Sequence, residues 1–308
     1  MTVSAREGRL ISGIGGRYQV RFPSGETVFC PARGVFRHAG ITPVVGDRVL
    51  IRLDGESPEA AMITEILPRD NVLIRPPVAN VSLMVVLTAV RDPEPSLLLL
   101  DEILSVLENA SIPSAIAVTK ADLDRVRAEK LKTKYQKCGY PVYVTSDRGD
   151  SEESQLHDEA LRVLKAGGTV ALCGVSGVGK SSLCNRLFPG LDLETGELSR
   201  RIARGRHTTR AVSLYPFESG YLTDTPGFSS LDFEHFDFFD LAELPSSFRE
   251  FEPLLGNCRY KKCTHTREEG CAILSAVAEK RIPRSRHDSY LTLYGILKKK
   301  PVWEKNER

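Results

Sequence analysis

The chain has 308 residues, of which 41% are hydrophobic and 27% are charged. This composition is typical of a globular protein and excludes a disordered chain, and the length predicts two or three domains. The longest apolar run, near residues 81–90, is too short to cross a bilayer, and residues 1–7 lack the apolar core of a signal peptide. We therefore expect a cytoplasmic protein with no membrane partner. The net charge of +2 excludes no other partner, because local patches matter more than the total.

Residues 1–68 predict an all-β domain. Short strands are expected at 17–22, 26–30, 48–52 and 61–66, with turns between them that contain Gly or Pro. Strands of this length and spacing indicate a small barrel, and an oligonucleotide-binding (OB) barrel is one candidate. An SH3-like or other small barrel without a ligand fits the pattern equally well.

Strands and helices alternate through residues 69–230, beginning with an apolar run at 81–88 that suits a strand buried on both faces. Helices are expected at 97–108, 122–137, 152–164 and 181–188, and strands at 114–118, 141–144, 169–173, 212–217 and 221–223. Such alternation predicts an α/β domain with a parallel sheet covered by helices.

The C-terminal segment, residues 231–308, differs from the rest in its distribution of charged residues. Residues 229–255 contain seven acidic residues and one Arg, whereas residues 256–308 contain 13 Lys or Arg and six acidic residues. The change of sign marks a separate C-terminal unit, which we expect to be mostly helical.

A phosphate-binding loop is predicted between an apolar strand and the start of a helix, which is the context that the motif requires. Its residues are Gly174-Val175-Ser176-Gly177-Val178-Gly179-Lys180-Ser181, followed by Ser182. Glycines let backbone N–H groups point at phosphate oxygens, and the helix N-terminus adds partial positive charge. We expect Lys180 to reach the β- and γ-phosphates and Ser181 to bind Mg²⁺. This motif alone predicts an NTPase and does not determine which nucleotide base is bound.

A magnesium switch is predicted at Asp224-Thr225-Pro226-Gly227, directly after an expected strand. The Asp224 carboxylate can hold Mg²⁺, and the Gly227 N–H can sense the γ-phosphate. Taken alone, the four residues would be an ordinary turn. Their position after a strand and downstream of the phosphate loop favours the functional interpretation.

A base reader is predicted at Thr119-Lys120-Ala121-Asp122, again after a strand. Asp122 would accept hydrogen bonds from guanine N1 and N2, a pair of donors that adenine lacks, and the Lys120 stem would lie along the base. The usual first residue is Asn, but a Thr119 hydroxyl can also tie neighbouring loops together. Thr145 and Ser146 follow the next strand. They form either a weaker backbone contact to guanine O6 or a plain turn.

The order of the three motifs is more informative than any one of them. The base reader comes first along the chain, whereas in ordinary GTPases it comes last. Each motif lies at the carboxyl edge of a strand, where doubly wound folds bind ligands, so moving the chain ends leaves that edge intact. The order therefore predicts a circularly permuted GTPase domain.

The catalytic group is less obvious. Many GTPases place a Gln after Asp-x-x-Gly to orient the attacking water, but Phe228 stands here. His207 lies where the first switch loop belongs and can orient water, and Thr208 (or Thr209) would contribute a Mg²⁺ ligand. A loop histidine bound to solvent or RNA phosphate is the alternative. Five Arg and one Glu within residues 197–210 favour contact with RNA phosphates over a solvated loop.

A metal site is predicted near the C-terminus from four soft ligands within 14 residues, namely Cys258, Cys263, His265 and Cys271. Three thiolates and one imidazole suit a tetrahedral structural zinc with no open position for chemistry. Basic residues surround these ligands, and a basic zinc knuckle is a common device for contacting RNA.

Taken together, these motifs make the chain resemble one family over nearly its whole length, the ribosome small-subunit-dependent GTPases (RsgA, also called YjeQ or YloQ). Besides the zinc ligands, the matching stretches are Gly34-Val35-Phe36-Arg37, Thr42-Pro43-Val44-Val45-Gly46-Asp47, Leu73-Ile74-Arg75-Pro76-Pro77, Gly177-Val178-Gly179-Lys180-Ser181-Ser182, Gly205-Arg206-His207-Thr208-Thr209 and Asp224-Thr225-Pro226-Gly227-Phe228. The resemblance implies an N-terminal OB barrel, a permuted GTPase domain and a C-terminal zinc domain. It also implies GTP hydrolysis stimulated by the small ribosomal subunit during its late maturation, and it favours a catalytic His207.

We therefore expect GTP or GDP, Mg²⁺ and one structural Zn²⁺ as ligands. The expected partner of the monomeric chain is the small ribosomal subunit, with its 16S-type rRNA and proteins. One alternative is a nucleotide-binding, RNA-binding module with little turnover, which Phe228 favours. Another is a P-loop ATPase or small-molecule kinase, which Asp122 opposes.

Overall fold

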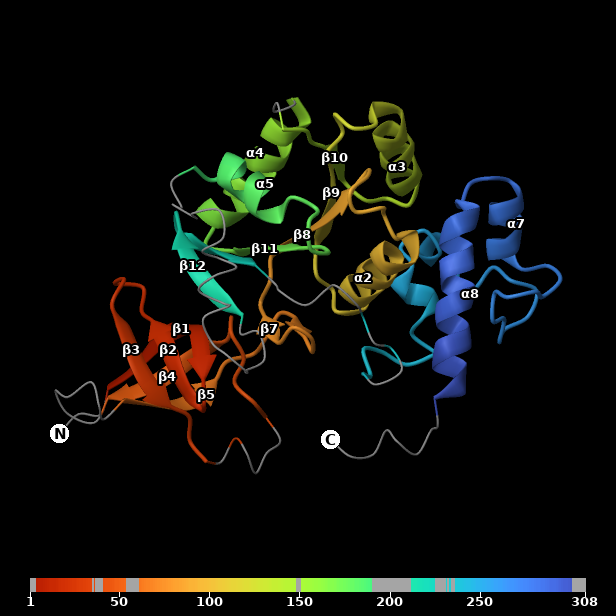
Figure 1. Ribbon diagram of the computed structural model, residues 1–308. Coiled ribbons are helices and arrows are strands. Elements are labelled where there is room, and N and C mark those ends of the chain that lie inside the picture. The colour runs from red at the N-terminus through yellow and green to blue at the C-terminus, as the bar shows by residue number, and fades with distance from the viewer. Residues whose placement is uncertain are drawn as a thin grey trace. The chain divides into compact units, whose positions relative to one another are not determined.

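The computed structural model describes residues 4–34, 36, 41–53, 61–147, 151–189, 212–224, 231, 233 and 236–300. Figure 1 shows them coloured from red at the N-terminus to blue at the C-terminus. The chain divides into two compact units. No helix in the described ranges has the length and apolar character needed to span a bilayer.

The first unit begins with an antiparallel sheet of five strands, drawn in red and orange in Figure 1. In chain order they are β1 (Ser4–Ile14), β2 (Arg17–Arg21), β3 (Thr27–Pro31), β4 (Arg48–Leu53) and β5 (Ala61–Ile66). The order across the sheet is β3-β2-β1-β4-β5. A parallel bridge from Ala32 to Ile63 and a 3.1 Å hydrogen bond from Arg33 N to Ile63 O connect the two outer strands. This closure makes the sheet a small barrel, and its strand order, with β1 between β2 and β4, makes the barrel OB-like, which decides between the two barrels that the sequence left open.

The long strand β1 was not singled out by the sequence pattern, because glycines interrupt its alternation. Gly8 is required there: a Cβ atom on it would lie 2.5 Å from Val20 Cγ1 of the neighbouring strand. Leu10, Val20, Ile51 and Ile63 fill the barrel and are fully buried. The barrel is therefore held by a small aliphatic core around a tightly coiled first strand.

A short hairpin follows the barrel, formed by β6 (Val72–Leu73) and β7 (Val78–Ala79). It is attached to the barrel by a 2.9 Å hydrogen bond from Ala79 N to Val45 O. The buried carboxylate of Asp47 accepts hydrogen bonds from Val44 N at 2.8 Å and from Arg69 Nε at 2.7 Å. Because a buried carboxylate needs several donors, this group orders the loop before β4 and the segment after β5 together.

Six further strands form the α/β sheet, which is parallel except for one edge strand. They are β8 (Leu83–Ala89), β9 (Ser114–Thr119), β10 (Val142–Val144), β11 (Thr169–Cys173), β12 (Ser213–Phe217) and β13 (Gly220–Asp224), and their order is β10-β9-β8-β11-β13-β12. Every residue of β8, β9 and β11 is buried. The burial of β8 confirms the prediction of a strand covered on both faces at 81–88, and β9 and β11 are covered in the same way.

Four helices connect these strands: α2 (Leu97–Asn109), α3 (Arg125–Lys137), α4 (Ser151–Lys165) and α5 (Lys180–Leu187). The sequence predicted that the second of them would begin at residue 122, but it begins three residues later. The reason is that the Asp124 side chain accepts a 3.0 Å hydrogen bond from Arg127 N and so caps the helix. The late start leaves residues 120–122 in a loop at the edge of the sheet.

The C-terminal segment contains two helical turns, η2 (Pro245–Ser247) and η3 (Glu252–Leu254), and two helices, α7 (Ala272–Ala278) and α8 (Arg284–Lys299). Its small core is aromatic. The rings of Phe248, Phe251 and Tyr290 lie with their centroids 5.1–5.4 Å apart. Such contacts give a short segment with few aliphatic residues enough buried area to fold.

A buried ionic cluster joins this segment to the α/β part of the second unit. The fully buried Arg286 of α8 donates from Nε to Glu250 at 2.6 Å, from Nη2 to the same carboxylate at 3.0 Å and from Nη1 to Asp101 of α2 at 2.8 Å. Tyr135 of α3 also donates to Asp101, at 2.8 Å. Three separate parts of the chain therefore share one buried guanidinium.

Candidate active site and metal centre

The phosphate loop connects β11 to α5 through glycines whose φ angles exclude other residues. Gly174, Gly177 and Gly179 have φ values of 146°, 83° and 93°. At Gly174 a Cβ atom would also lie only 2.6 Å from the carbonyl oxygen of Leu87. These positive angles turn the backbone tightly between strand and helix, as a phosphate cradle requires. The structure thus places residues 174–182 in the predicted strand–loop–helix context.

Lys180 is the first residue of α5 and turns back over the loop that precedes it. Its ammonium group donates to the carbonyl oxygens of Gly174 at 2.7 Å and Val175 at 3.2 Å. The cation therefore lies at the mouth of the phosphate loop. Ser181 and Ser182 follow in the first turn of the helix, where the helix dipole favours anions.

Thr119, the first residue of the predicted base reader, ends β9 and is buried. Its hydroxyl donates a 2.6 Å hydrogen bond to the carbonyl oxygen of Val178 in the phosphate loop. The oxygen of Thr88, at the end of the neighbouring strand, lies 3.4 Å away. The side chain that replaces the usual Asn thus links the two loops directly.

Lys120 and Asp122 lie in the loop between β9 and α3. Lys120 has a φ of 57°, and its ammonium group donates to the carbonyl oxygen of Asp92. Asp122 is exposed at the same edge of the sheet. The carboxylate is therefore accessible to a ligand, and the lysine side chain is held by a main-chain oxygen.

Thr145 and Ser146 are buried next to this loop, after β10. Backbone hydrogen bonds hold the two segments together, from Ala121 N to Thr145 O at 3.1 Å and from Thr145 N to Val118 O at 2.8 Å. The Thr145 hydroxyl is buried and has no hydrogen-bond partner among the described residues. The segment therefore packs against the predicted base reader, as a contact to the base requires.

The predicted magnesium switch is only partly described. β13 ends at Asp224, beside β11, and so brings this residue to the edge of the sheet that carries the phosphate loop. The Asp224 side chain, Gly227, Phe228, His207, Thr208 and the arginines of residues 197–210 lie outside the described residues.

Asp92 is a residue of this site that the sequence did not reveal. It follows β8, has a φ of 48° and precedes Pro93, and its main-chain oxygen receives Lys120. A main-chain acceptor has no signature in side-chain chemistry. The turn signal of Asp-Pro directly after a buried strand was the only available indication.

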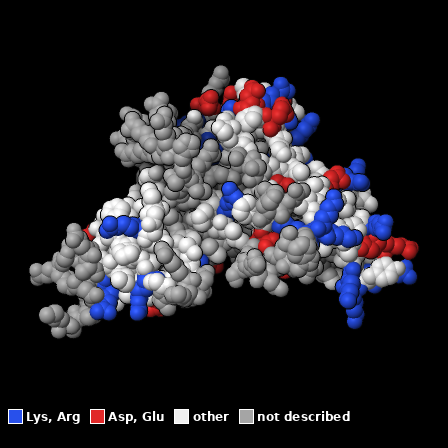
Figure 2. Space-filling view, turned by 60° about the horizontal axis from the view of Figure 1, so that its bottom comes forward, with Lys and Arg blue, Asp and Glu red and all other residues white. Residues whose placement is uncertain are grey.

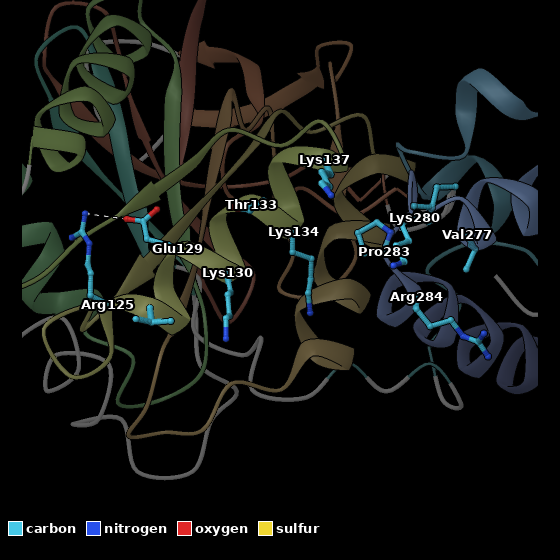
Figure 3. A pocket seen from close by; sticks show the side chains of 12 residues that line it. Arg125, Glu129, Lys130, Thr133, Lys134, Lys137, Val277, Lys280, Pro283 and Arg284 are labelled. Atoms are coloured by element: carbon cyan, nitrogen blue, oxygen red, sulfur yellow. Dashed lines mark ion pairs between the residues drawn. The ribbon is translucent and has the colours of Figure 1, made fainter.

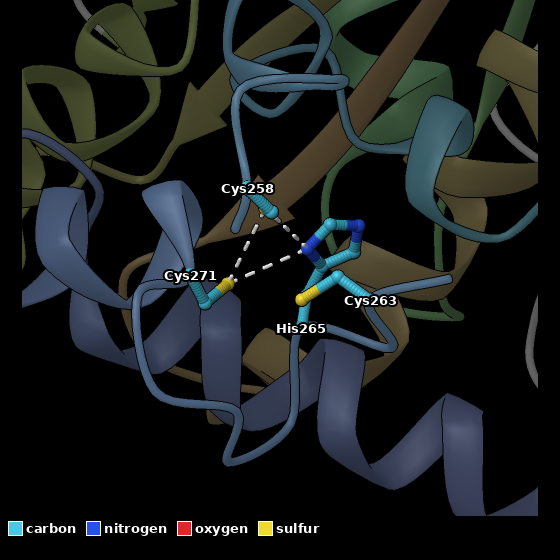
Figure 4. A group of neighbouring side chains, drawn as sticks. All are labelled: Cys258, Cys263, His265 and Cys271. Carbon is cyan, nitrogen blue, oxygen red and sulfur yellow. Dashed lines mark hydrogen bonds between the residues drawn. The ribbon is translucent and has the colours of Figure 1, made fainter. Parts of the chain in front are cut away.

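The candidate metal centre is formed by Cys258, Cys263, His265 and Cys271, shown in Figure 4. Their ligand atoms all lie within 4.8 Å of one another. His265 Nδ1 lies 3.6 Å from Cys258 Sγ and 3.5 Å from Cys271 Sγ, and the two sulfurs are 3.9 Å apart. Tetrahedral zinc bonds of about 2.3 Å to sulfur and about 2.0 Å to nitrogen place ligand atoms about 3.5–3.8 Å apart. The four residues therefore fit a zinc ion.

The surroundings of these ligands hold their backbone in place. His287 of α8 contacts the His265 carbonyl oxygen at 2.8 Å, and Tyr290 donates to the Thr264 carbonyl oxygen at 2.8 Å. Ala272 N donates a 3.4 Å hydrogen bond to Cys258 Sγ. Such outer contacts orient the ligands of a metal site.

The arrangement of the loops defines the class of protein. The predicted phosphate loop and the predicted base reader meet at one edge of a mostly parallel sheet, and the second precedes the first in the chain. This arrangement is that of a circularly permuted P-loop GTPase. The model of the RsgA GTPase family matches residues 66–234, and that of the RsgA N-terminal domain matches residues 7–60. The chain belongs to the RsgA GTPase family and is a GTP-hydrolysing enzyme.

Relatives and solved structures agree with this assignment. A small ribosomal subunit biogenesis GTPase RsgA from Alkaliphilus metalliredigens is 42% identical over 95% of this chain and 98% of its own length. One of the same name from Enterococcus faecalis is 39% identical over 97% and 98%. The structure is similar to that of YjeQ from Thermotoga maritima, with a TM-score of 0.77, 30% identity and coverage of 97% and 100%. It is also similar to YloQ, a circularly permuted GTPase, with a TM-score of 0.72, 30% identity and 97% coverage of both chains.

Proposed function

We propose that the chain acts in late maturation of the small ribosomal subunit, hydrolysing GTP to GDP and phosphate with stimulation by that subunit. The observation that carries this proposal is the bond from Thr119 to Val178, because it couples a base-reading loop to a phosphate loop within one permuted site. The printed names of relatives that match nearly the whole chain supply the partner.

In this proposal the nucleotide lies across the carboxyl edge of the sheet. Residues 174–182 surround the phosphates, Lys180 contacts the β- and γ-phosphates, and Asp122 with Lys120 reads guanine. Thr145 and Ser146 line the base from the neighbouring loop. Ser181, Thr208 and Asp224 hold Mg²⁺, which neutralises charge on the phosphates when bound.

His207 is the proposed group that orients the attacking water, because Phe228 cannot donate or accept a hydrogen bond. The test compares His207→Ala with the wild type for GTP affinity and for subunit-stimulated turnover. Loss of turnover with intact GTP binding is expected. Unchanged stimulated turnover removes His207 from the mechanism.

The other parts of the chain supply contacts to the subunit. We take residues 1–68, 69–230 and 231–308 as an RNA-binding barrel, the GTPase domain and a zinc domain that holds one structural Zn²⁺. The arginines of residues 197–210 and the basic zinc domain meet rRNA phosphates. In the view of Figure 2, several basic groups lie on the side of the molecule that carries the C-terminal helices. The chain acts as a cytoplasmic monomer.

The decisive experiment measures GTP hydrolysis with and without isolated small subunits. An increase in turnover that large subunits do not produce supports the proposal. If the rate of GTP hydrolysis is the same with and without small subunits, the alternative that Phe228 favours remains. That alternative is an RNA-binding module that holds nucleotide with little turnover. Competition of ATP against GTP in the same assay distinguishes the subunit-stimulated GTPase and the RNA-binding module from an ATPase or kinase.

A further inference from the structure

A groove of about 730 Å³ lies between α3 and the segment that connects α7 to α8, away from the nucleotide loops. Figure 3 shows lysines of α3 on one side and Lys280, Pro283 and Arg284 on the other. All of its lining residues belong to the second unit. Neither GTP binding nor the zinc ligands explain this hollow.

The rim of the groove is strongly basic. Two of its arginines have acidic partners, Arg125 with Glu129 at 3.1 Å and Arg284 with Asp288 at 3.1 Å. Four ammonium groups of the rim form no ion pair within the described part of the chain, namely those of Lys130, Lys134, Lys137 and Lys280. The groove therefore offers four uncompensated positive charges around one concave surface.

The floor of the groove is aliphatic. Val126 is 66% exposed in the first turn of α3, and Val277, Ile282 and Pro283 continue the apolar surface on the other side. The groove therefore combines an exposed aliphatic side chain with four unpaired ammonium groups on one surface.

We propose that this groove binds an acidic amphipathic segment of a partner protein, with apolar side chains on the floor and carboxylates at the lysines. Its volume is that of a pocket for a few side chains, which is too small for a nucleic-acid duplex. None of its lining residues is aromatic, so it offers no platform for stacking single-stranded bases. Apolar anchors with flanking charges are the pattern of a helix that binds in a groove. The proposal goes beyond the ribosomal role and does not depend on it.

The test uses fluorescence anisotropy with a synthetic labelled peptide that carries Leu at positions i, i+3, i+4 and i+7 and Glu on its flanks. Lys134→Glu with Lys137→Glu is expected to weaken binding about tenfold or more, because two attractions become repulsions. The matched control is Arg162→Glu with Lys165→Glu, since it also reverses two last-turn cations, in α4. The control is expected to leave the affinity within about twofold.

A second pair of variants tests the floor. Val126→Ser is expected to weaken the peptide several-fold, whereas Ile14→Ser, at a barrel residue that is 79% exposed, is expected to have no effect. Three results would each overturn the proposal: equal losses in groove and control variants, equal binding of a peptide with Gln in place of Glu, or binding of a single-stranded RNA at these lysines without binding of the peptide. Basal GTP hydrolysis is expected to stay unchanged in all four variants.

Discussion

The Thr119 hydroxyl donates a 2.6 Å hydrogen bond to the carbonyl oxygen of Val178, a residue 59 positions further along the chain. One end of this bond lies in the loop that we propose to read the base, and the other lies in the loop that we propose to hold the phosphates. A shift of either loop therefore stretches a buried hydrogen bond. In this chain a hydroxyl performs the linking that an amide side chain performs in many GTPases.

Thr119→Ala should weaken binding of GTP and GDP alike, because it removes this link without touching the nucleotide. A buried hydrogen bond contributes about 0.5–1.5 kcal/mol, so the expected loss is about two- to tenfold in Kd. Thr119→Ser, which keeps the hydroxyl, is the matched control and should stay near the wild type. Titration with a fluorescent GDP measures both. A loss of the same size in Thr119→Ser would show that the methyl group matters and not the hydrogen bond.

Arg286→Ala should destabilise the second unit by about 3–5 kcal/mol, because it leaves two buried carboxylates without their cation. Asp101 and Glu250 both lose a charged donor. The control is Arg281→Ala, since Arg281 forms only an exposed ion pair with Glu279 and should change stability by about 0.5 kcal/mol or less. Urea unfolding followed by circular dichroism compares them. Equal urea midpoints for Arg286→Ala and Arg281→Ala would contradict the claim that the ionic cluster stabilises the second unit.

Cys271→Ser should abolish stoichiometric zinc binding, because a tetrahedral site that loses one thiolate binds zinc far less tightly. Metal analysis of the purified wild type is expected to give about one zinc ion per chain. Cys30→Ala, which changes a buried cysteine of the barrel, should retain the full zinc content. Full zinc content in Cys271→Ser would place the ion elsewhere.

Glu102 makes stability depend on pH, because burial, followed by the nearby charge of Asp101, raises its pKa to about 7 from 4.5. Between these two values the folded chain keeps a proton that the unfolded chain releases, so this contribution to stability falls as the pH rises. The free energy of unfolding of Glu102→Gln should therefore equal that of the wild type at pH 4.5 and be larger than that of the wild type at pH 8. The excess is about 1 kcal/mol once the partial exposure of the side chain is allowed for. An equal difference at both pH values would contradict the raised pKa.

Much of this structure could be predicted from local patterns. The apolar runs of β8, β9 and β11 indicated buried parallel strands, and the cluster of three cysteines and one histidine could be read from their residue types and spacing. The barrel type was not accessible in this way. It depends on the contact between residues 32 and 63, which a pattern within single strands does not contain.

The ionic cluster was also beyond the reach of the sequence. An Arg near the start of a helix is normally solvated, and the partners of Arg286 lie 36 and 185 positions away. The sequence could not indicate the Asp92 carbonyl that holds Lys120, because every residue carries a main-chain oxygen. Long-range pairing and main-chain acceptors account for most of what the sequence left open.

The cluster around Arg286 also limits how this protein can be recombined. Consider a chimera whose C-terminal segment comes from a relative that lacks an Arg at this position. Its carboxylates at positions 101 and 250 would lie close together with no cation between them. A workable exchange must therefore move α2, the 245–255 segment and α8 as one cassette. Natural substitutions at any of these three positions are expected to occur together with compensating changes at the other two.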